Sequence, residues 1–172
     1  SEITADMLVK GTRWRDALGL AKAIDFVGGT IAADSMFEAT LVSCSVLSRN
    51  LDTCFGLMPE MLWQPSFPEA ELARVKDQEV AKVRQRFDDA GAMASSHVQN
   101  LLWGPDHVRG WVTSVESVQA LKRDDVVAWH KQWFVPGNAM LVVTGDVDPK
   151  KIKGVIEAKF NGWPKGPTPP TP

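Results

Sequence analysis

The sequence predicts an α+β domain in which helices pack on an antiparallel sheet. Segments with helical periodicity outnumber segments with strand character and lie before, between and after them. The clearest strand-like segments, residues 30–34 and 38–47, follow each other closely, which favours antiparallel pairing over a doubly wound parallel sheet. A chain of 172 residues is long enough to bury a hydrophobic core.

The first third of the chain contributes two helices and the strand pair. One helix is expected over residues 3–9. A second is expected over residues 15–27, because apolar side chains recur there at helical spacing and glycines follow: Ala17, Leu20, Ile24 and Val27, then Gly28 and Gly29. Residues 38–47 alternate in part and are rich in threonine, valine, leucine and serine, which predicts a strand paired with residues 30–34.

The middle of the chain predicts helices only. Residues 50–63 have the apolar spacing of a helix, although Pro59 removes a hydrogen bond inside it. A long, charged helix follows over residues 69–87. Asp88 or Asp89 then caps a further helix, and both of these helices are expected to be half-exposed.

The last third alternates short elements with breaks. Residues 104–114 are polar and contain glycine, which predicts a loop. Helices are expected over residues 115–121 and 124–133, and an apolar strand over residues 139–144. Asp148 and Pro149 begin a final helix that extends to residue 160.

The final residues, 162–172, are dominated by proline and predict an extended linker, because proline continues neither a helix nor a central strand. The folded domain is therefore expected over residues 1–161.

The charge and apolar patterns exclude several classes of protein. The chain has 19 basic and 21 acidic residues with mixed signs, so we expect no nucleic-acid partner, whose binding needs clustered Lys and Arg. No apolar run approaches the roughly 18 residues of a membrane span. Cys44 and Cys54 are the only cysteines. They are too few for a disulfide scaffold and lie in apolar segments, so we predict buried thiols.

Several short sequence segments, taken together in their order along the chain, resemble the pitrilysin (inverzincin) family of zinc peptidases. This family includes insulin-degrading enzyme and the mitochondrial processing peptidase. These segments are Met7–Thr12, Ile24–Ala33, Leu47–Leu51, Pro65–Pro68, Trp133–Ala139 and Val142–Pro149. The resemblance covers nearly the whole chain. It implies a pitrilysin-like metallohydrolase domain over residues 1–161 that is partial, with its first strands missing.

The resemblance also locates the zinc site of active members. In those members His-x-x-Glu-His precedes the first segment: both His bind zinc, the Glu is the general base, and a Glu of the long charged helix is the third ligand. In this sequence Glu2 and Asp6 stand at the His positions, Ala5 at the base and Lys82 at the third ligand. We therefore expect no catalytic residue, no metal ligand and no cofactor, with zinc only in a partner subunit.

The substituted residues allow two interpretations. Glu2 and Asp6 share one face of a helix, so the Lys82 ammonium could replace the metal cation with an ion pair. Alternatively, all three groups are separately solvated.

A binding site is also implied by the resemblance. Thr30, Ile31, Ala32 and Ala33 resemble the edge strand on which peptides dock in the family by adding a strand, with ordinary sheet structure as the alternative. The loop Gly104–Gly110 resembles a segment near the substrate chamber, although a plain surface loop is equally compatible. The three histidines, His97, His107 and His130, lack ligand spacing.

The leading functional prediction is a noncatalytic subunit or half of a pitrilysin-type peptidase. It would form chamber wall and peptide-binding surface for an active zinc-bearing partner. One alternative is a structural or assembly protein with the same fold. The other is an active zinc metalloendopeptidase whose site is misaligned here. The resemblance suggests a bacterial periplasmic or secreted setting.

Overall fold

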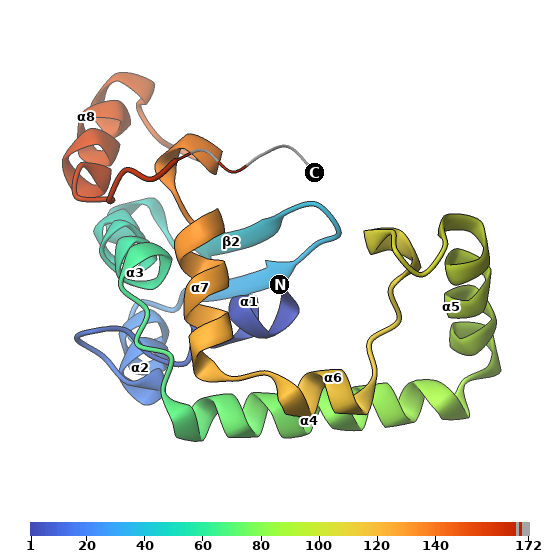
Figure 1. The fold of residues 1–172 in the computed structure, drawn as a ribbon. Helices are drawn as coiled ribbons and strands as arrows, with labels where there is room; N and C mark the ends of the chain where they lie inside the picture. The colour runs from blue at the N-terminus through green and yellow to red at the C-terminus, as the bar shows by residue number, and fades with distance from the viewer. Residues whose placement is uncertain (168, 170–172) are drawn as a thin grey trace.

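The computed structural model describes residues 1–167 and residue 169. Helices surround a two-stranded antiparallel sheet in this part of the chain, so the predicted α+β class is confirmed (Figure 1). The helices are α1 (Glu2–Leu8), α2 (Ala17–Asp25), α3 (Leu51–Trp63), α4 (Glu69–Asp88), α5 (Ala90–Trp103), α6 (Val115–Ala120), α7 (Arg123–Trp133) and α8 (Pro149–Phe160). The strands are β1 (Thr30–Ser35) and β2 (Thr40–Ser45), and the short 3₁₀ turns are η1 (Ser48–Asn50), η2 (Val108–Gly110) and η3 (Pro136–Asn138).

The helix starts follow from local capping. The side chain of Asp16 accepts the backbone N–H of Gly19, and Asp89 accepts those of Gly91 and Ala92. Asp148 does the same for the first turn of α8. Each carboxylate satisfies amides that have no partner inside the helix, which sets where the helix begins.

The strands form one tight hairpin. Thr30 pairs with Ser45 at one end and Ser35 with Thr40 at the other, and Met36 N–H donates to Ala39 O at 2.7 Å to close the turn. In Figure 1, β1 lies on the α1 side of the hairpin and β2 on the α3 side.

The core lies between one face of the sheet and helices α1, α2, α3, α4 and α7. Its fully buried side chains come from all of these helices: Met7, Leu8, Leu20, Met61, Val75 and Val126. Burying one such side chain contributes about 1.5–3 kcal/mol. A smaller cluster of Val80, Val83 and Val118 packs α6 on α4. None of the described helices is long and apolar enough to cross a membrane.

Residues 90–113, which we call the arm, stand away from this core. The long helix α4 extends past the body, and α5 rises from its far end in a direction across that of α4 (Figure 1). No residue of α5 is buried. Its exposed apolar side chains include Val98, Leu101 and Leu102.

The predicted strand over residues 139–144 is wrong. These residues belong to no sheet, and Met140 and Val142 are 89% and 70% exposed. A strand needs a neighbour with which to exchange backbone hydrogen bonds, and β1 and β2 pair with each other. The apolar pattern is present, but the described part of the chain supplies no partner strand.

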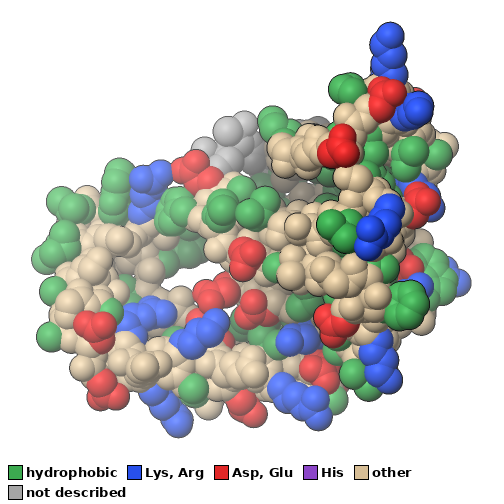
Figure 2. All heavy atoms as spheres, turned by 180° about the vertical axis from the view of Figure 1, so that it is seen from behind, with side chains coloured by type: hydrophobic (Ala, Val, Ile, Leu, Met, Phe, Trp, Pro, Cys, Tyr) green, Lys and Arg blue, Asp and Glu red, His purple; other side chains and the backbone are tan. Residues whose placement is uncertain are grey.

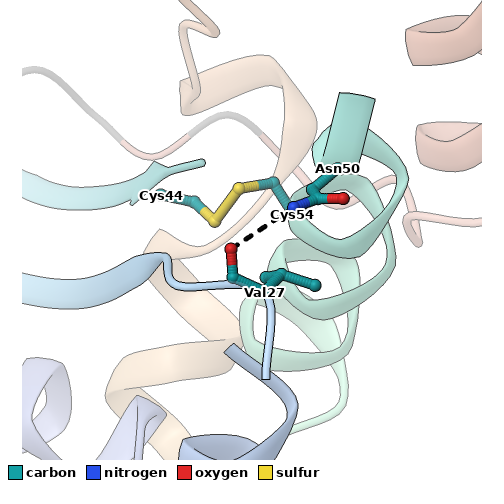
Figure 3. Close-up of a disulfide and its surroundings, with 4 residues drawn as sticks. All are labelled: Val27, Cys44, Asn50 and Cys54. Carbon is teal, nitrogen blue, oxygen red and sulfur yellow. Dashed lines mark hydrogen bonds between the residues drawn. A yellow bond between two sulfur atoms is a disulfide. The ribbon is translucent and has the colours of Figure 1, made fainter. Parts of the chain in front are cut away.

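The prediction of buried thiols is also wrong, because Cys44 and Cys54 form a disulfide (Figure 3). Their Cα atoms are 5.8 Å apart, since η1 reverses the chain between β2 and α3. Beside the disulfide, Nδ2 of Asn50 donates to Val27 O at 3.3 Å. The two bonds together tie the start of α3 to β2 and to the segment that precedes β1.

The predicted linker, residues 162–172, lies in part outside the described residues and stays a prediction. Its first residues pack against the body: the Trp163 ring stacks on Trp63 with centroids 5.4 Å apart, and its Nε1–H donates to Phe134 O at 3.0 Å.

Candidate functional site

Helix α1 holds three of the residues singled out from the sequence. Glu2 is exposed at its first position, and Asp6 lies one turn later, half-buried. Ala5 is fully buried and has no proton-accepting group. Ser35 Oγ at the end of β1 donates to Ser1 Oγ at 3.1 Å, so the start of α1 lies beside the end of β1.

Helix α4 brings Lys82 to this position. Its Nζ lies 3.0 Å from Glu2 Oε1 and 3.1 Å from Glu79 Oε2. The geometry is the one that the ion-pair hypothesis requires, with Glu2 as the partner on α1. Glu2 and Lys82 are therefore not separately solvated, whereas Asp6 forms no ion pair among the described residues.

Glu79 is the member of this cluster that sequence reasoning missed. It is 4% exposed, and its Oε2 has Lys82 within ion-pair distance but no hydrogen bond of good geometry. A buried carboxylate on a charged helix is uncommon unless it is paired. The available signal was the i, i+3 spacing between Glu79 and Lys82, which places both on one helix face.

Two groups in this region, Lys82 and Asp6, have shifted pKa values. Hydrogen bonding to Glu2, and the carboxylate of Glu79 close by, raise the pKa of Lys82, so the ammonium keeps its proton. Burial raises the pKa of Asp6, and the nearby Lys82 opposes that shift only in part. The cluster is therefore organised around a fixed positive charge.

These residues do not fit a zinc ion. The ammonium stands between the carboxylates of Glu2 and Glu79, where a second cation would be repelled. In residues 1–167 and 169, no group of three or more His, Cys, Asp or Glu side chains is arranged to hold a metal. No chemical step through a metal follows from this arrangement.

The second candidate site, Thr30–Ala33, lies on β1. Ile31 and Ala33 pack on the core, whereas Thr30 and Asp34 are exposed. The edge of β1 opposite β2 has no backbone hydrogen bond to another element within the described residues. It therefore presents free donors and acceptors, as an edge strand does.

The hairpin register shows which amides point outward. Hydrogen-bonded and non-bonded pairs alternate in an antiparallel ladder, and Met36 N–H bonds Ala39 O just beyond the last pair. By this alternation, Ala32 and Asp34 exchange bonds with β2. The N–H and C=O groups of Ile31, Ala33 and Ser35 then face the free edge.

The histidines do not come together. His97 is exposed on α5, and His107 stacks on Trp103 in the arm, with centroids 4.9 Å apart. His130 is buried on α7, where its Nε2 lies 2.8 Å from Leu62 O, and burial lowers its pKa. Because a carbonyl oxygen only accepts, Nε2 carries the proton.

The loop Gly104–Gly110 also contains a residue that sequence reasoning did not single out. Arg109 Nη2 lies 2.7 Å from Glu38 Oε1, so it joins the arm to the hairpin turn. A single arginine in a polar loop has no sequence signal that identifies such a distant partner.

Comparison with known proteins gives matches along most of the chain. Residues 1–105 match the family model described as "Insulinase (Peptidase family M16)", and residues 120–172 match the model described as "Peptidase M16 inactive domain". An "uncharacterized zinc protease" of Streptomyces coelicolor is 26% identical over 90% of this chain and 34% of its own length. A "non-peptidase homolog" of Helicobacter pylori is 23% identical over 96% of this chain and 39% of its own length.

A solved structure has the same fold. The peptidase M16 inactive domain from Pseudomonas fluorescens superposes with a TM-score of 0.90 at 22% identity, over 96% of this chain and 41% of that protein. The chain thus spans well under half the length of these relatives.

Proposed function

The chain belongs to the insulinase family of peptidases, M16, and we propose that it is a noncatalytic domain of that family. In this proposal it binds extended peptides along β1 and forms chamber wall for a separate zinc-bearing partner or second half. The proposed peptide-binding stretch is Thr30, Ile31, Ala32 and Ala33, of which Ile31 and Ala33 turn their backbone N–H and C=O groups to the free edge.

The observation that carries the noncatalytic assignment is the ion-paired ammonium of Lys82. The resemblance places the metal position of active members between α1 and α4, and here Glu2 and Glu79 hold Lys82 in that region. At the same time, Ala5 supplies no general base for activating water. Metal binding and proton transfer are therefore lost together.

The free edge of β1 supports the peptide-binding part of the proposal. A peptide that adds a strand is held by main-chain hydrogen bonds, so its affinity depends little on side chains at the edge.

Zinc content and cleavage test the noncatalytic assignment. We expect the purified chain to bind no stoichiometric zinc and to cleave no unstructured peptide, and we expect cleavage after a catalytic family member is added as partner. Stoichiometric zinc with cleavage by the chain alone would mean that it is an active metalloendopeptidase. A zinc-bearing mixture that binds no peptide and cleaves none would favour the structural or assembly role.

Backbone methylation of a peptide tests the β1 site. A fluorescent peptide of about ten alternating valine and lysine residues, the length of a long strand, is the probe. N-methylation at alternate residues should abolish binding in one frame and spare it in the other, because only every second amide of an added strand faces β1. Thr30→Ala, as a side-chain control, should leave the affinity unchanged. Equal effects in both frames would contradict docking by strand addition.

A further inference from the structure

The arm and the hairpin turn meet at one cluster of charged and aromatic side chains. Arg109 Nη2 of the arm lies 2.7 Å from Glu38 Oε1 of the turn. The same guanidinium covers the ring of Phe37, 4.7 Å from its centroid, and the ring of Trp103, 5.3 Å from its centroid. One arginine thus makes an ion pair and a cation–π contact with the turn at the same time.

The arm holds Arg109 in place for these contacts. Its backbone N–H donates to Nδ1 of His107 at 3.1 Å, and His107 stacks on Trp103. Nδ2 of Asn100 donates to Gly110 O at 2.8 Å, which fastens η2 to α5. The guanidinium is therefore presented by a small ordered unit rather than by a free loop.

Among the described residues, no other ion pair or hydrogen bond joins the arm to residues 36–39. Because α5 buries no residue, the arm has little apolar packing to hold it closed. We call Arg109 with Phe37, Glu38 and Trp103 the latch.

The latch closes a ring. Helix α4 leads away from the body, the arm turns back, and the latch returns the chain to the hairpin turn (Figure 1). Figure 2 shows an opening through the molecule between the arm, α4 and the body, with charged side chains of both signs beside it. The strand β1 ends at Ser35, immediately before the turn that the latch holds.

We propose that Arg109 latches this ring across the end of the β1 edge, so that the site accepts extended peptides with a free end, which enter lengthwise. The proposal rests on the proposed peptide binding by β1. A peptide strand that continues past Ser35 meets the ring, and a chain with bulky folded domains at both ends cannot pass through it. Opening the latch removes this restriction.

The chemistry of the latch makes it reversible. The Arg109 and Glu38 side chains are 43% and 66% exposed, so their ion pair is screened by salt. The planar guanidinium suits simultaneous stacking and ion pairing, which a lysine ammonium does less well.

Two versions of the valine–lysine probe test the selection. One carries a small folded domain at one end, and the other carries that domain at both ends. For the wild-type chain we expect the doubly blocked probe to bind more slowly by about tenfold or more. In Arg109→Ala the two probes should bind at equal rates. In Glu38→Gln, which keeps the stacking of Arg109 on the aromatic rings, the difference between the two rates should be smaller than in the wild type and larger than in Arg109→Ala. Arg74→Ala is the matched control, because it removes an arginine whose ion pair with Glu71 stays within α4. Equal binding of both probes to the wild type would overturn the proposal.

A distance measurement separates the latch from the peptide site. Spin labels at Ala39→Cys and Ala94→Cys, both exposed positions, report the gap between turn and arm. We expect one narrow distance distribution in the latched chain and a broad one when Arg109→Ala is added. An unchanged distribution would overturn the latch whatever the peptides do. Failure of the singly blocked probe to bind, with labels that respond as expected, would overturn the peptide function instead.

Discussion

In the region between α1 and α4, Lys82 stands where the family resemblance places a metal ion. A metal ion would link these helices through ligands from both, and here one ammonium links Glu2 of α1 to the buried Glu79 of α4. The link costs little desolvation on the lysine side, since Lys82 is 54% exposed, but it neutralises a carboxylate that is almost fully buried. Lys82 is therefore structural as well as incompatible with zinc.

Lys82→Met removes the charge and keeps most of the side-chain stem. We expect it to lower the free energy of unfolding by about 1–2 kcal/mol, because Glu79 is left buried without a counter-charge. Urea denaturation measures the change. The double variant that combines Lys82→Met with Glu79→Gln should regain most of the free energy of unfolding that Lys82→Met loses. The control is Lys153→Met, whose pair with Glu157 is exposed and 3.9 Å long. A loss for Lys82→Met no larger than for this control would contradict the role of the cluster.

His130 gives stability a dependence on pH. Burial lowers its pKa below the ordinary value of 6.5, so the folded state favours neutral imidazole. As pH falls below 6.5, the unfolded chain takes up a proton that the folded chain refuses, and stability declines. Above that pH the contribution is fully present.

Urea midpoints at several pH values, compared between wild type and His130→Gln, isolate this contribution. The wild type should lose more stability than the variant on acidification from pH 7 toward the lowered pKa. His97→Gln, which changes an exposed histidine, should behave as the wild type. Identical pH profiles for His130→Gln and wild type would show that His130 is not held neutral.

At the scale of elements, the disulfide determines how β2 meets α3. Cys44 and Cys54 are separated by 10 positions, so oxidation closes a short loop around η1. Together with the Asn50 hydrogen bond to Val27 O, it fixes the far side of the hairpin that carries β1. Stable disulfides are typical of oxidising compartments, the setting that the family resemblance suggests.

Replacing both cysteines with serine should lower the free energy of unfolding by about 2–3 kcal/mol, from the loop entropy that the bond removes. Urea denaturation of the double variant, of the oxidised wild type and of the reduced wild type makes the comparison. The reduced wild type should match the double variant. Two titratable thiols in the oxidised, denatured wild type would show that the bond is absent.

The helices could be predicted because their determinants are local. Asp16, Asp89 and Asp148 cap helices within a few residues of where the sequence predicts starts. The disulfide and the missing strand at residues 139–144 could not be predicted. Both depend on which distant segment lies alongside, and a local pattern carries no such information.

The same distinction holds for the sites. The family pattern selected Glu2, Asp6 and Lys82, and folding brings Glu2 and Lys82 together although they are 80 positions apart. Glu79 and Arg109 were missed, because charged residues on a helix or in a loop usually face solvent. Their roles become visible only when burial and the partner Glu38 are known.

At the scale of the whole molecule, the chain leaves surfaces that a stable assembly would cover. A two-stranded sheet is marginal by itself and depends on the helices that pack on it. The arm exposes Val98, Leu101 and Leu102, and residues 139–144 expose an apolar strand pattern without a neighbour. Exposed apolar surface of this kind marks interaction sites, which fits a domain that works with a partner or second half.

Hydrogen exchange can test this assembly role directly. In the chain alone, the amides of residues 140–144 should exchange fast, because none donates a hydrogen bond within the described residues. Amides in the middle of α7 should exchange slowly, since Val126 and His130 anchor that helix in the core. When a catalytic family member is added, we expect new protection at residues 140–144 and on α5, with α7 unchanged as the internal control. If cleavage is gained while both surfaces still exchange as in the free chain, the partner must contact the domain elsewhere, and the exposed strand and arm would not form the interface.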